Sequence, residues 1–211
     1  MYKRYAGKWY KNFTFYQTTE NYRNDSLIKT STWHEAIVYP NLFRITIGDS
    51  ANGNAMIVKG DSVYNFSKSK MVRKAANEDD LTFLLGGMYF LPYYTVVQKM
   101  KQEGYDINKA GETTFEGKAV YIIGASDTSE KTSQVWIEKE RLIVVRMIKY
   151  KTDMKEDAIF GDYKKVENGW RENSVIFYLK DKLYQQEKYY DCKANTIIDV
   201  KIFDPYKFIK Y

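Results

Sequence analysis

Side chains that commonly carry catalysis are sparse in this sequence of 211 residues. His34 is the only histidine and Cys192 the only cysteine, and no GxSxG motif accompanies them. A catalytic triad needs a recognisable nucleophile, and a zinc site needs several clustered ligands. We therefore expect no enzyme activity, no bound metal and no cofactor. We expect His34 at the surface or a strand edge, and Cys192 in the core.

Paired carboxylates occur where charge is ordinary. Asp79 and Asp80 precede an apolar segment that is typical of a helix, and either could cap it. Glu138 and Glu140 flank a predicted hairpin tip. Pairs of this kind can serve as acid and base in hydrolysis, but these positions favour solvated surface groups. The two glycines at 86–87 lack the spacing of a phosphate-binding loop.

Two arginines interrupt apolar strand segments, Arg44 in PNLFR and Arg146 in VVRM. A guanidinium almost never enters a protein core without partners. Two interpretations remain open for each. The side chain points outward or lies on an edge, or it stands at the lip of a cavity. At a cavity lip it would bond loop carbonyls that hold helices closed, or the polar head of a lipid.

Charge and hydropathy exclude two classes of partner. The net charge is +6, yet Lys and Arg alternate with Asp and Glu and form no basic block of five or more. We therefore expect no nucleic-acid partner. No apolar run approaches the roughly 18 residues that a spanning helix needs, so we expect no transmembrane segment. We expect a monomer.

The elements that must position these residues are mostly strands. Aromatic residues make up 17% of the chain, with 20 Tyr, a composition that favours sheets. Apolar side chains occupy both parities of residues 142–148, so both faces of that strand should be covered. Roughly eleven to thirteen antiparallel strands are expected, at 12–20, 26–39, 43–48, two within 54–66, 113–117, 118–125, 134–138, 141–150, 158–166, 174–180, 182–192 and 199–203.

Residues 78–104 break the strand pattern. Ten of the fourteen residues 81–94 are large and apolar or aromatic. A helix over 81–85 should end at the two glycines, and a second should run to Gly104 with Pro92 in its first turn. Helices this apolar must lie inside a curled sheet or across its mouth. We expect a single domain over 1–211, with first-half strands at 1–77, a helical lid at 78–104 and second-half strands at 105–211.

Six segments form a characteristic series when they are taken in order. They are FTFYQTT at 13–19, YPNLFRITIG at 39–48, MIVKGDSVYNF at 56–66, FEGKAVYIIGA, SQVWIEKERLIVVRM and FGDYKKVENGW. In order and spacing they resemble the LolA-like family, the periplasmic carriers of outer-membrane lipoproteins, and the resemblance spans about residues 5–208. One departure is that Val144-Val145-Arg146 lacks the proline of the family's LPxR pattern.

The resemblance implies an incomplete, strongly curved antiparallel β-barrel whose helices cover or enter a hydrophobic cavity that takes acyl chains. It places Arg44 near an arginine that bonds lid carbonyls in this family. It also implies the periplasm, a leader upstream of Met1, an inner-membrane donor and an outer-membrane acceptor. The candidate ligand contacts are Phe13, Phe15, Trp33, Phe43, Ile45, Met56, Val58, Phe83, Leu84, Leu85, Met88, Phe90 and Leu91.

A function of another class stays open on the same fold. The helices could fill the barrel, and an exposed strand edge or a basic face could then bind another protein. The chain would in that case be a lipid-sensing or protein-binding regulatory module. The two hypotheses differ in whether the interior has room for an acyl chain.

Overall fold

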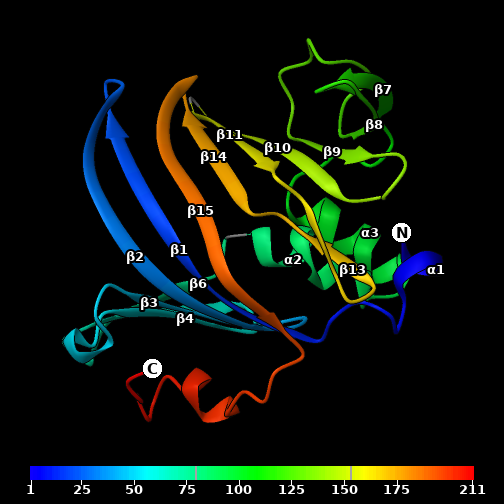
Figure 1. The fold of residues 1–211 in the computed structure, drawn as a ribbon. Helices are drawn as coiled ribbons and strands as arrows, with labels where there is room; N and C mark the ends of the chain where they lie inside the picture. Colours follow the sequence, from blue (N-terminus) through cyan, green and yellow to red (C-terminus); the bar gives the residue numbers. More distant parts are fainter. Residues whose placement is uncertain (79, 153) are drawn as a thin grey trace.

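One antiparallel sheet runs through most of the chain and curves strongly around a concave side (Figure 1). The structure, a computed structural model, describes residues 1–78, 80–152 and 154–211. Within these residues the sheet has thirteen strands in the order β6-β5-β4-β3-β2-β1-β15-β14-β11-β10-β9-β8-β7. The sheet is open, because β6 and β7 form its two edges. This confirms the predicted incomplete antiparallel barrel, and the thirteen strands of the sheet agree with the expected number.

The strands of the first half are joined to those of the second by the pairing of β1 with β15. β1, β2 and β15 are the longest, and their length lets the sheet coil. The sheet strands are β1 Asn12–Arg23, β2 Ser26–Val38, β3 Leu42–Ile47, β4 Ala55–Lys59, β5 Ser62–Ser67, β6 Lys70–Ala76, β7 Ala110–Phe115, β8 Lys118–Ile123, β9 Gln134–Glu138, β10 Val144–Lys151, β11 Met154–Gly161, β14 Ser174–Leu179 and β15 Lys182–Ala194. A separate hairpin pairs β12 (Lys164–Val166) with β13 (Gly169–Arg171).

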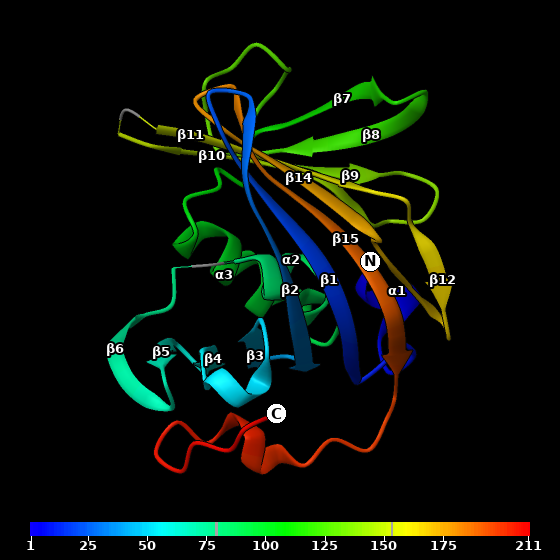
Figure 2. The same ribbon diagram turned by 60° about the vertical axis from the view of Figure 1, so that its left-hand side comes forward.

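The helices between the two halves lie inside the curve of the sheet (Figures 1 and 2). They are α2 (Leu81–Leu85), the 3-10 turn η2 (Gly87–Tyr89) and α3 (Tyr93–Gln102). Pro92 directly precedes α3 rather than occupying its first turn. The other short helices are α1 (Tyr2–Tyr5), η1 (Ser50–Asn52) and η3 (Val200–Phe203). The strand expected at 199–203 is therefore wrong: the Asp199 carboxylate accepts from the Lys201 amide (3.0 Å) and starts a 3-10 turn.

Some of the carboxylates that were expected at the surface are buried. Asp80 precedes α2 without capping it; its carboxylate accepts from the Tyr105 hydroxyl (2.7 Å) and lies 3.0 Å from Lys149 Nζ. Glu138 is buried and accepts from Arg141 Nε (2.8 Å), whereas Glu140 is exposed as expected. The partners of Asp80 are invisible in local sequence because they come from distant segments, whereas Arg141 lies only three residues from Glu138. Asp79 lies outside the described residues.

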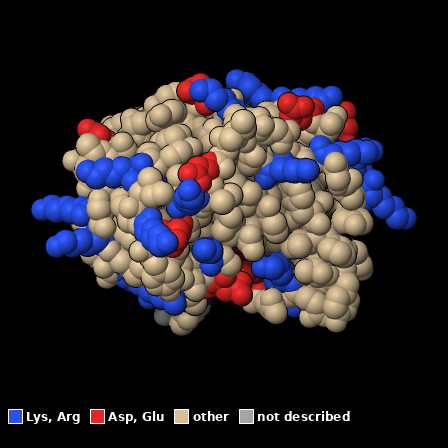
Figure 3. Space-filling model, turned by 90° about the horizontal axis from the view of Figure 1, so that it is seen from below, with Lys and Arg blue, Asp and Glu red and all other residues tan. Residues whose placement is uncertain are grey.

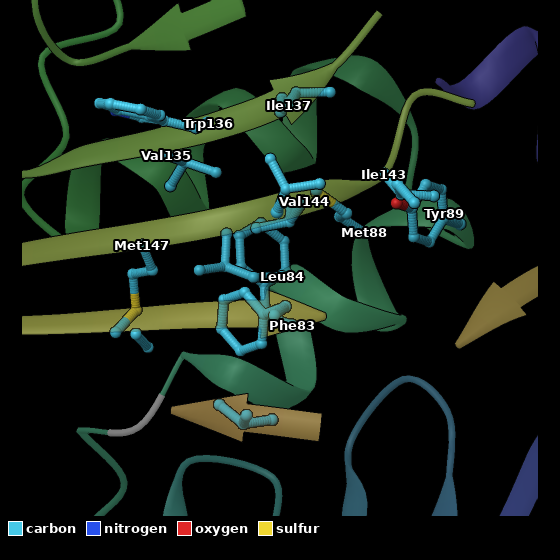
Figure 4. Close-up of a cluster of buried hydrophobic side chains, with 14 of the residues drawn as sticks. Phe83, Leu84, Met88, Tyr89, Val135, Trp136, Ile137, Ile143, Val144 and Met147 are labelled. Carbon is cyan, nitrogen blue, oxygen red and sulfur yellow. The ribbon is translucent and has the colours of Figure 1, made fainter. Parts of the chain in front are cut away.

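The second half of the concave side is filled by the helices (Figure 4). Leu84 and Met88 belong to the same buried cluster as Val135, Val144 and Met147 of β9 and β10. Leu84 has no exposed surface. The other face of these strands is also covered, since Phe115 packs edge-on against Trp136 with ring centroids 5.3 Å apart. Both faces are thus buried, which accounts for the apolar residues on both parities of 142–148.

Candidate functional site

The concave side of the first half contains a cavity of about 180 Å³. Most of its lining residues come from α2 and from β1, β2, β3, β14 and β15. Figures 1 and 2 show α2 on the concave side of the sheet. Alternate residues of each strand reach it, as the period of two in a strand requires. Its lining consists of Tyr10, Phe13, Phe15, Trp33, Glu35, Ile37, Tyr39, Phe43, Ile45, Leu81, Thr82, Leu85, Glu172, Phe177, Gln185, Glu187 and Tyr189.

Aromatic rings form much of the cavity wall. The ring centroid of Phe13 lies 5.3 Å from Tyr10 and 5.2 Å from Phe15, and Phe15 lies 4.4 Å from Tyr189. Tilted rings at these spacings stabilise one another beyond the area they bury. The wall is therefore built from packed rings that keep its shape and present an apolar surface.

Helix α2 supplies the opposite wall. Leu81 and Leu85, four residues apart and so on one helix face, both line the cavity. The helix ends at Gly86, where an added Cβ would lie 2.1 Å from the Tyr39 ring, itself part of the cavity lining. Only glycine allows this close approach. Gly86 therefore lets α2 sit directly against the cavity wall.

The size of the cavity suits part of a hydrocarbon tail. An apolar cavity of about 150 Å³ binds benzene, whereas sites for drug-sized ligands span about 300–1,000 Å³. At 180 Å³ the cavity holds a segment of roughly six carbons. With about 0.8 kcal/mol per buried methylene, such a segment contributes about 5 kcal/mol. A longer tail requires α2 to move away from the sheet.

Polar groups gather on one part of the cavity lining. Glu35 and Glu187 are more than nine-tenths buried. The Glu187 carboxylate accepts from the Gln185 amide (2.6 Å) and the Tyr189 hydroxyl (2.8 Å). Burial, with a smaller contribution from the charge of Glu187, raises the pKa of Glu172 to about 7 against the opposing effects of a backbone hydrogen bond and Arg171. The cavity is thus apolar on most sides and carries carboxylates on one.

Six of the predicted contact residues line this cavity, namely Phe13, Phe15, Trp33, Phe43, Ile45 and Leu85. Val58 and Met56 pack beside Phe43 and Ile45. Val58, Phe83 and Leu91 line a second hollow next to Lys99. Their role in ligand binding stays a prediction.

Three predicted contacts lie elsewhere. Leu84 and Met88 are part of the filled core under α2 and η2 (Figure 4). Phe90 stacks on Tyr39 from behind the cavity, with ring centroids 5.6 Å apart. These side chains hold the helices in place, because their neighbours are protein groups.

Arg44 points away from the helices. Its neighbours Phe43 and Ile45 face the cavity, so strand alternation turns Arg44 to the convex face. There it is fully buried and donates to the carbonyls of Ile202 (2.6 Å) and Ile209 (2.7 Å). Burial lowers its pKa to about 10, which leaves it charged at neutral pH. The predicted lid latch is corrected: Arg44 secures the C-terminal segment.

Arg146 forms a structural ion pair. Its Nε donates to Asp157 Oδ1 (2.8 Å) and its Nη2 to Asp157 Oδ2 (2.5 Å) on the next strand. The guanidinium also lies 4.6 Å from the Trp136 ring centroid. Its donors face protein groups, so these contacts give it no place at the cavity lip.

His34 lies between the rings of Tyr16 (4.3 Å) and Tyr211 (4.7 Å), on an inner strand rather than at an edge. Burial and Arg44 lower its pKa. Cys192 is half-buried, and burial raises its pKa to about 11.

Among the described residues no group of His, Cys, Asp and Glu is arranged to hold a metal ion, and no helix could cross a membrane. Figure 3 shows Lys and Arg spread among Asp and Glu over one face of the molecule.

The sequence interpretation missed the contribution of the second half. Gln185, Glu187 and Tyr189 alternate on β15, and their parity marks one face of a strand. Nothing local shows that β15 pairs with β1 and brings that face to the cavity. Glu35 carried a local signal, since it shares its parity with Trp33 and Ile37 on β2.

The comparison with solved structures was made with this geometry in hand. A putative outer membrane lipoprotein-sorting protein domain from Vibrio parahaemolyticus is 12% identical, with 96% of this chain and 92% of that chain covered and a TM-score of 0.65. A LolA superfamily protein from Nitrosomonas europaea is 13% identical, with 96% and 95% covered and a TM-score of 0.63. The chain shares its fold with these two structures.

A further solved structure is similar in fold to this chain. A DUF1329 family protein from Desulfovibrio piger is 13% identical over 92% of this chain and 90% of that chain, with a TM-score of 0.63. No protein-family model and no curated protein sequence matches the chain. The similarity therefore concerns the fold, which agrees with the resemblance found in the sequence.

Proposed function

We propose that this LolA-like chain is a non-enzymatic carrier that binds an acyl chain of a lipid-modified protein between α2 and the sheet. One observation carries the proposal: the cavity of about 180 Å³ lies on the concave side of an open sheet and is walled by aromatic rings and a short helix. The solved structures of similar fold, which include an outer membrane lipoprotein-sorting domain, support it. On this proposal the chain acts in the periplasm, between a donor at the inner membrane and an acceptor at the outer membrane.

Weak and adjustable binding suits a carrier. A short segment of tail in the closed cavity contributes about 5 kcal/mol, too little for tight binding. Outward movement of α2 would expose more apolar wall and accept more of the tail. Return of the helix would lower the affinity and release the cargo, because a ligand follows the state that binds it better. Leu84 of the same helix stays buried in the filled core, so on this proposal α2 pivots about that anchor rather than leaving the sheet.

The test is saturable binding of N-phenyl-1-naphthylamine, an uncharged apolar fluorophore, followed by displacement with dodecanol. Leu85→Asp should weaken binding roughly tenfold or more, because it places a carboxylate in the apolar wall. Leu27→Asp is the matched control, since Leu27 is exposed near a hairpin tip. Circular dichroism verifies that both variants keep their sheet. Equal affinity in Leu85→Asp and the natural chain would contradict the proposal.

A further inference from the structure

The polar part of the cavity lining is rich in carboxylates and contains no cationic side chain among the described residues. Three carboxylates line it, from Glu35, Glu172 and Glu187. The donors beside them are directed at protein groups: those of Gln185 and Tyr189 at Glu187, and the Trp33 indole at Ser31 (3.0 Å). No lysine or arginine is found among the described residues that line the cavity.

A buried amide oxygen next to the cavity lining has no hydrogen-bond donor among the described residues. Gln17 is fully buried on the inner face of β1, opposite Trp33 on one side and Tyr189 on the other. Both of these neighbours line the cavity. Its Nε2 donates to Thr19 Oγ1 (2.8 Å), but its Oε1 has no partner among the described residues. A buried acceptor of this kind is stabilised by a donor.

Arg171 is the cation that acts on this region. Its guanidinium carbon lies 5.4 Å from the Phe13 ring centroid, and its Nη1 donates to the backbone carbonyl of Glu172 (3.2 Å). It lowers the pKa of Glu172, against the stronger effect of burial. One guanidinium beside the lining offsets at most one of three carboxylates. The local charge around the cavity is therefore negative when these carboxylates are ionised, although the whole chain carries +6.

We propose that the cavity selects amphiphiles whose polar end is a protonated amine and discriminates against free fatty acids of the same chain length. The inference rests on the proposed function, because it assumes that the apolar part of the cavity takes a tail. An ammonium beside a tail would donate to these carboxylates and to Gln17, in charge-assisted hydrogen bonds. A fatty-acid carboxylate would meet like charges in a site shielded from water, where repulsion is strong.

The test compares dodecylamine, dodecanol and dodecanoic acid as competitors of N-phenyl-1-naphthylamine at pH 8. Dodecylammonium should bind roughly tenfold or more tightly than dodecanoate, with dodecanol between them. The net positive charge of the chain would favour dodecanoate. Tighter binding of dodecylammonium would therefore report the charge of the cavity and not that of the whole chain. Equal or tighter binding of dodecanoate would overturn the inference while dodecanol displacement still supports the carrier. If none of the three displaces the fluorophore, the proposed function fails as well.

Two variants locate the effect. Glu187→Gln and Glu172→Gln should each lower the amine-to-acid affinity ratio severalfold, with the affinity of each variant for dodecanol measured as its own reference. Glu140→Gln is the matched control, because Glu140 is exposed at a hairpin. An unchanged ratio in both cavity variants would overturn the inference. Glu172 lies on a loop, so its variant keeps the β15 hydrogen bonds if Glu187→Gln fails to fold.

The ratio should also rise in the natural chain between pH 6 and pH 8, since the pKa of Glu172 is about 7. If the amine-to-acid affinity ratio stays constant across this range in the natural chain and in every variant, the result would count against a charged cavity. The titratable groups that surround Glu172 are Glu35 and Glu187 on β2 and β15, Arg171, and the tyrosines Tyr10, Tyr39, Tyr163 and Tyr189.

Two sources supply an amine beside a tail. They are lipids with an amine head group and acylated peptides with a free α-amino group. Lysophosphatidylethanolamine and a peptide with an S-dodecyl N-terminal cysteine represent them, each against its N-acetylated form. Tighter binding of one free amine than of its acetylated form supports the inference and identifies the source. No difference in either pair would contradict it.

Discussion

The two halves of the concave side use the same helix differently. Against β9 and β10, α2 buries Leu84 in a filled core with no exposed surface (Figure 4). Against β1, β2, β3 and β15, the same helix presents Leu81 and Leu85 to a cavity of about 180 Å³. Adjacent helix positions point about 100° apart, so one short helix can anchor on one side and wall a hollow on the other. The filled half fixes the helix, and the hollow half is available for a ligand.

The largest expected effect breaks the filled half. Leu84→Ala should lower the free energy of unfolding by about 4 kcal/mol, because it leaves a cavity among closely packed groups. Leu85→Ala should cost about 1 kcal/mol, since its side chain already borders a cavity. Urea unfolding of both variants measures the difference. Equal losses would show that the two sides of α2 are packed alike.

The next effect concerns the convex face. Arg44→Met should lower stability by about 3 kcal/mol, because the carbonyls of Ile202 and Ile209 lose a charged donor. Limited proteolysis should then cut within residues 195–211, while fluorophore binding stays unchanged. Arg23→Met, at an exposed position of a hairpin, is the control. Weaker fluorophore binding in Arg44→Met would restore a latch role for this residue.

A pH effect sharpens the view of the hollow half. The pKa of Glu172 is about 7 in the fold and above its usual value, so the ionised form is disfavoured there. The contribution of Glu172 to stability is present below its unfolded pKa and is lost as the pH rises through 7. Glu172→Gln should therefore gain about 2 kcal/mol relative to the natural chain between pH 5 and pH 8, allowing for contact with solvent. Urea unfolding at both pH values measures this; a constant difference would contradict the raised pKa.

The smallest effect tests Arg146. Arg146→Lys keeps the charge but loses the paired hydrogen bonds to Asp157, so stability should fall by about 1 kcal/mol. Thermal unfolding measures the change. The affinity for N-phenyl-1-naphthylamine and for dodecylamine should be unaltered. A loss of dodecylamine binding would return Arg146 to the head-group role that its sequence position suggested.

Local patterns predicted much of the fold. Alternation predicted most strands, and the turn at Lys59–Ser62 contains Gly60 with φ of 60°, as expected of a hairpin glycine. The 199–203 segment failed because its apolar residues Ile202 and Phe203 pack onto the convex face from a 3-10 turn. A short apolar run does not reveal whether a neighbouring strand is within pairing reach.

The sequence predicted the apolar wall of the cavity but not its carboxylates. Phe13, Phe15, Trp33, Phe43 and Ile45 line the cavity as their parity suggested. Glu187 was missed because the pairing of β15 with β1 joins residues more than 150 positions apart. Glu172 was missed because it lies on the loop between β13 and β14, where no strand pattern marks its direction. Arg44 was misassigned for a related reason: its partners lie in the C-terminal segment, which carries no motif.

The measurement that tests the account most directly is photo-crosslinking with a dodecylamine that carries a diazirine in its tail. Labelled residues are identified by mass spectrometry, with unlabelled dodecylamine as competitor. The account predicts saturable labelling within 13–15, 33–45 and 81–85, around the cavity. Labelling within 135–147 of the filled half, or labelling that the competitor does not reduce, would contradict it.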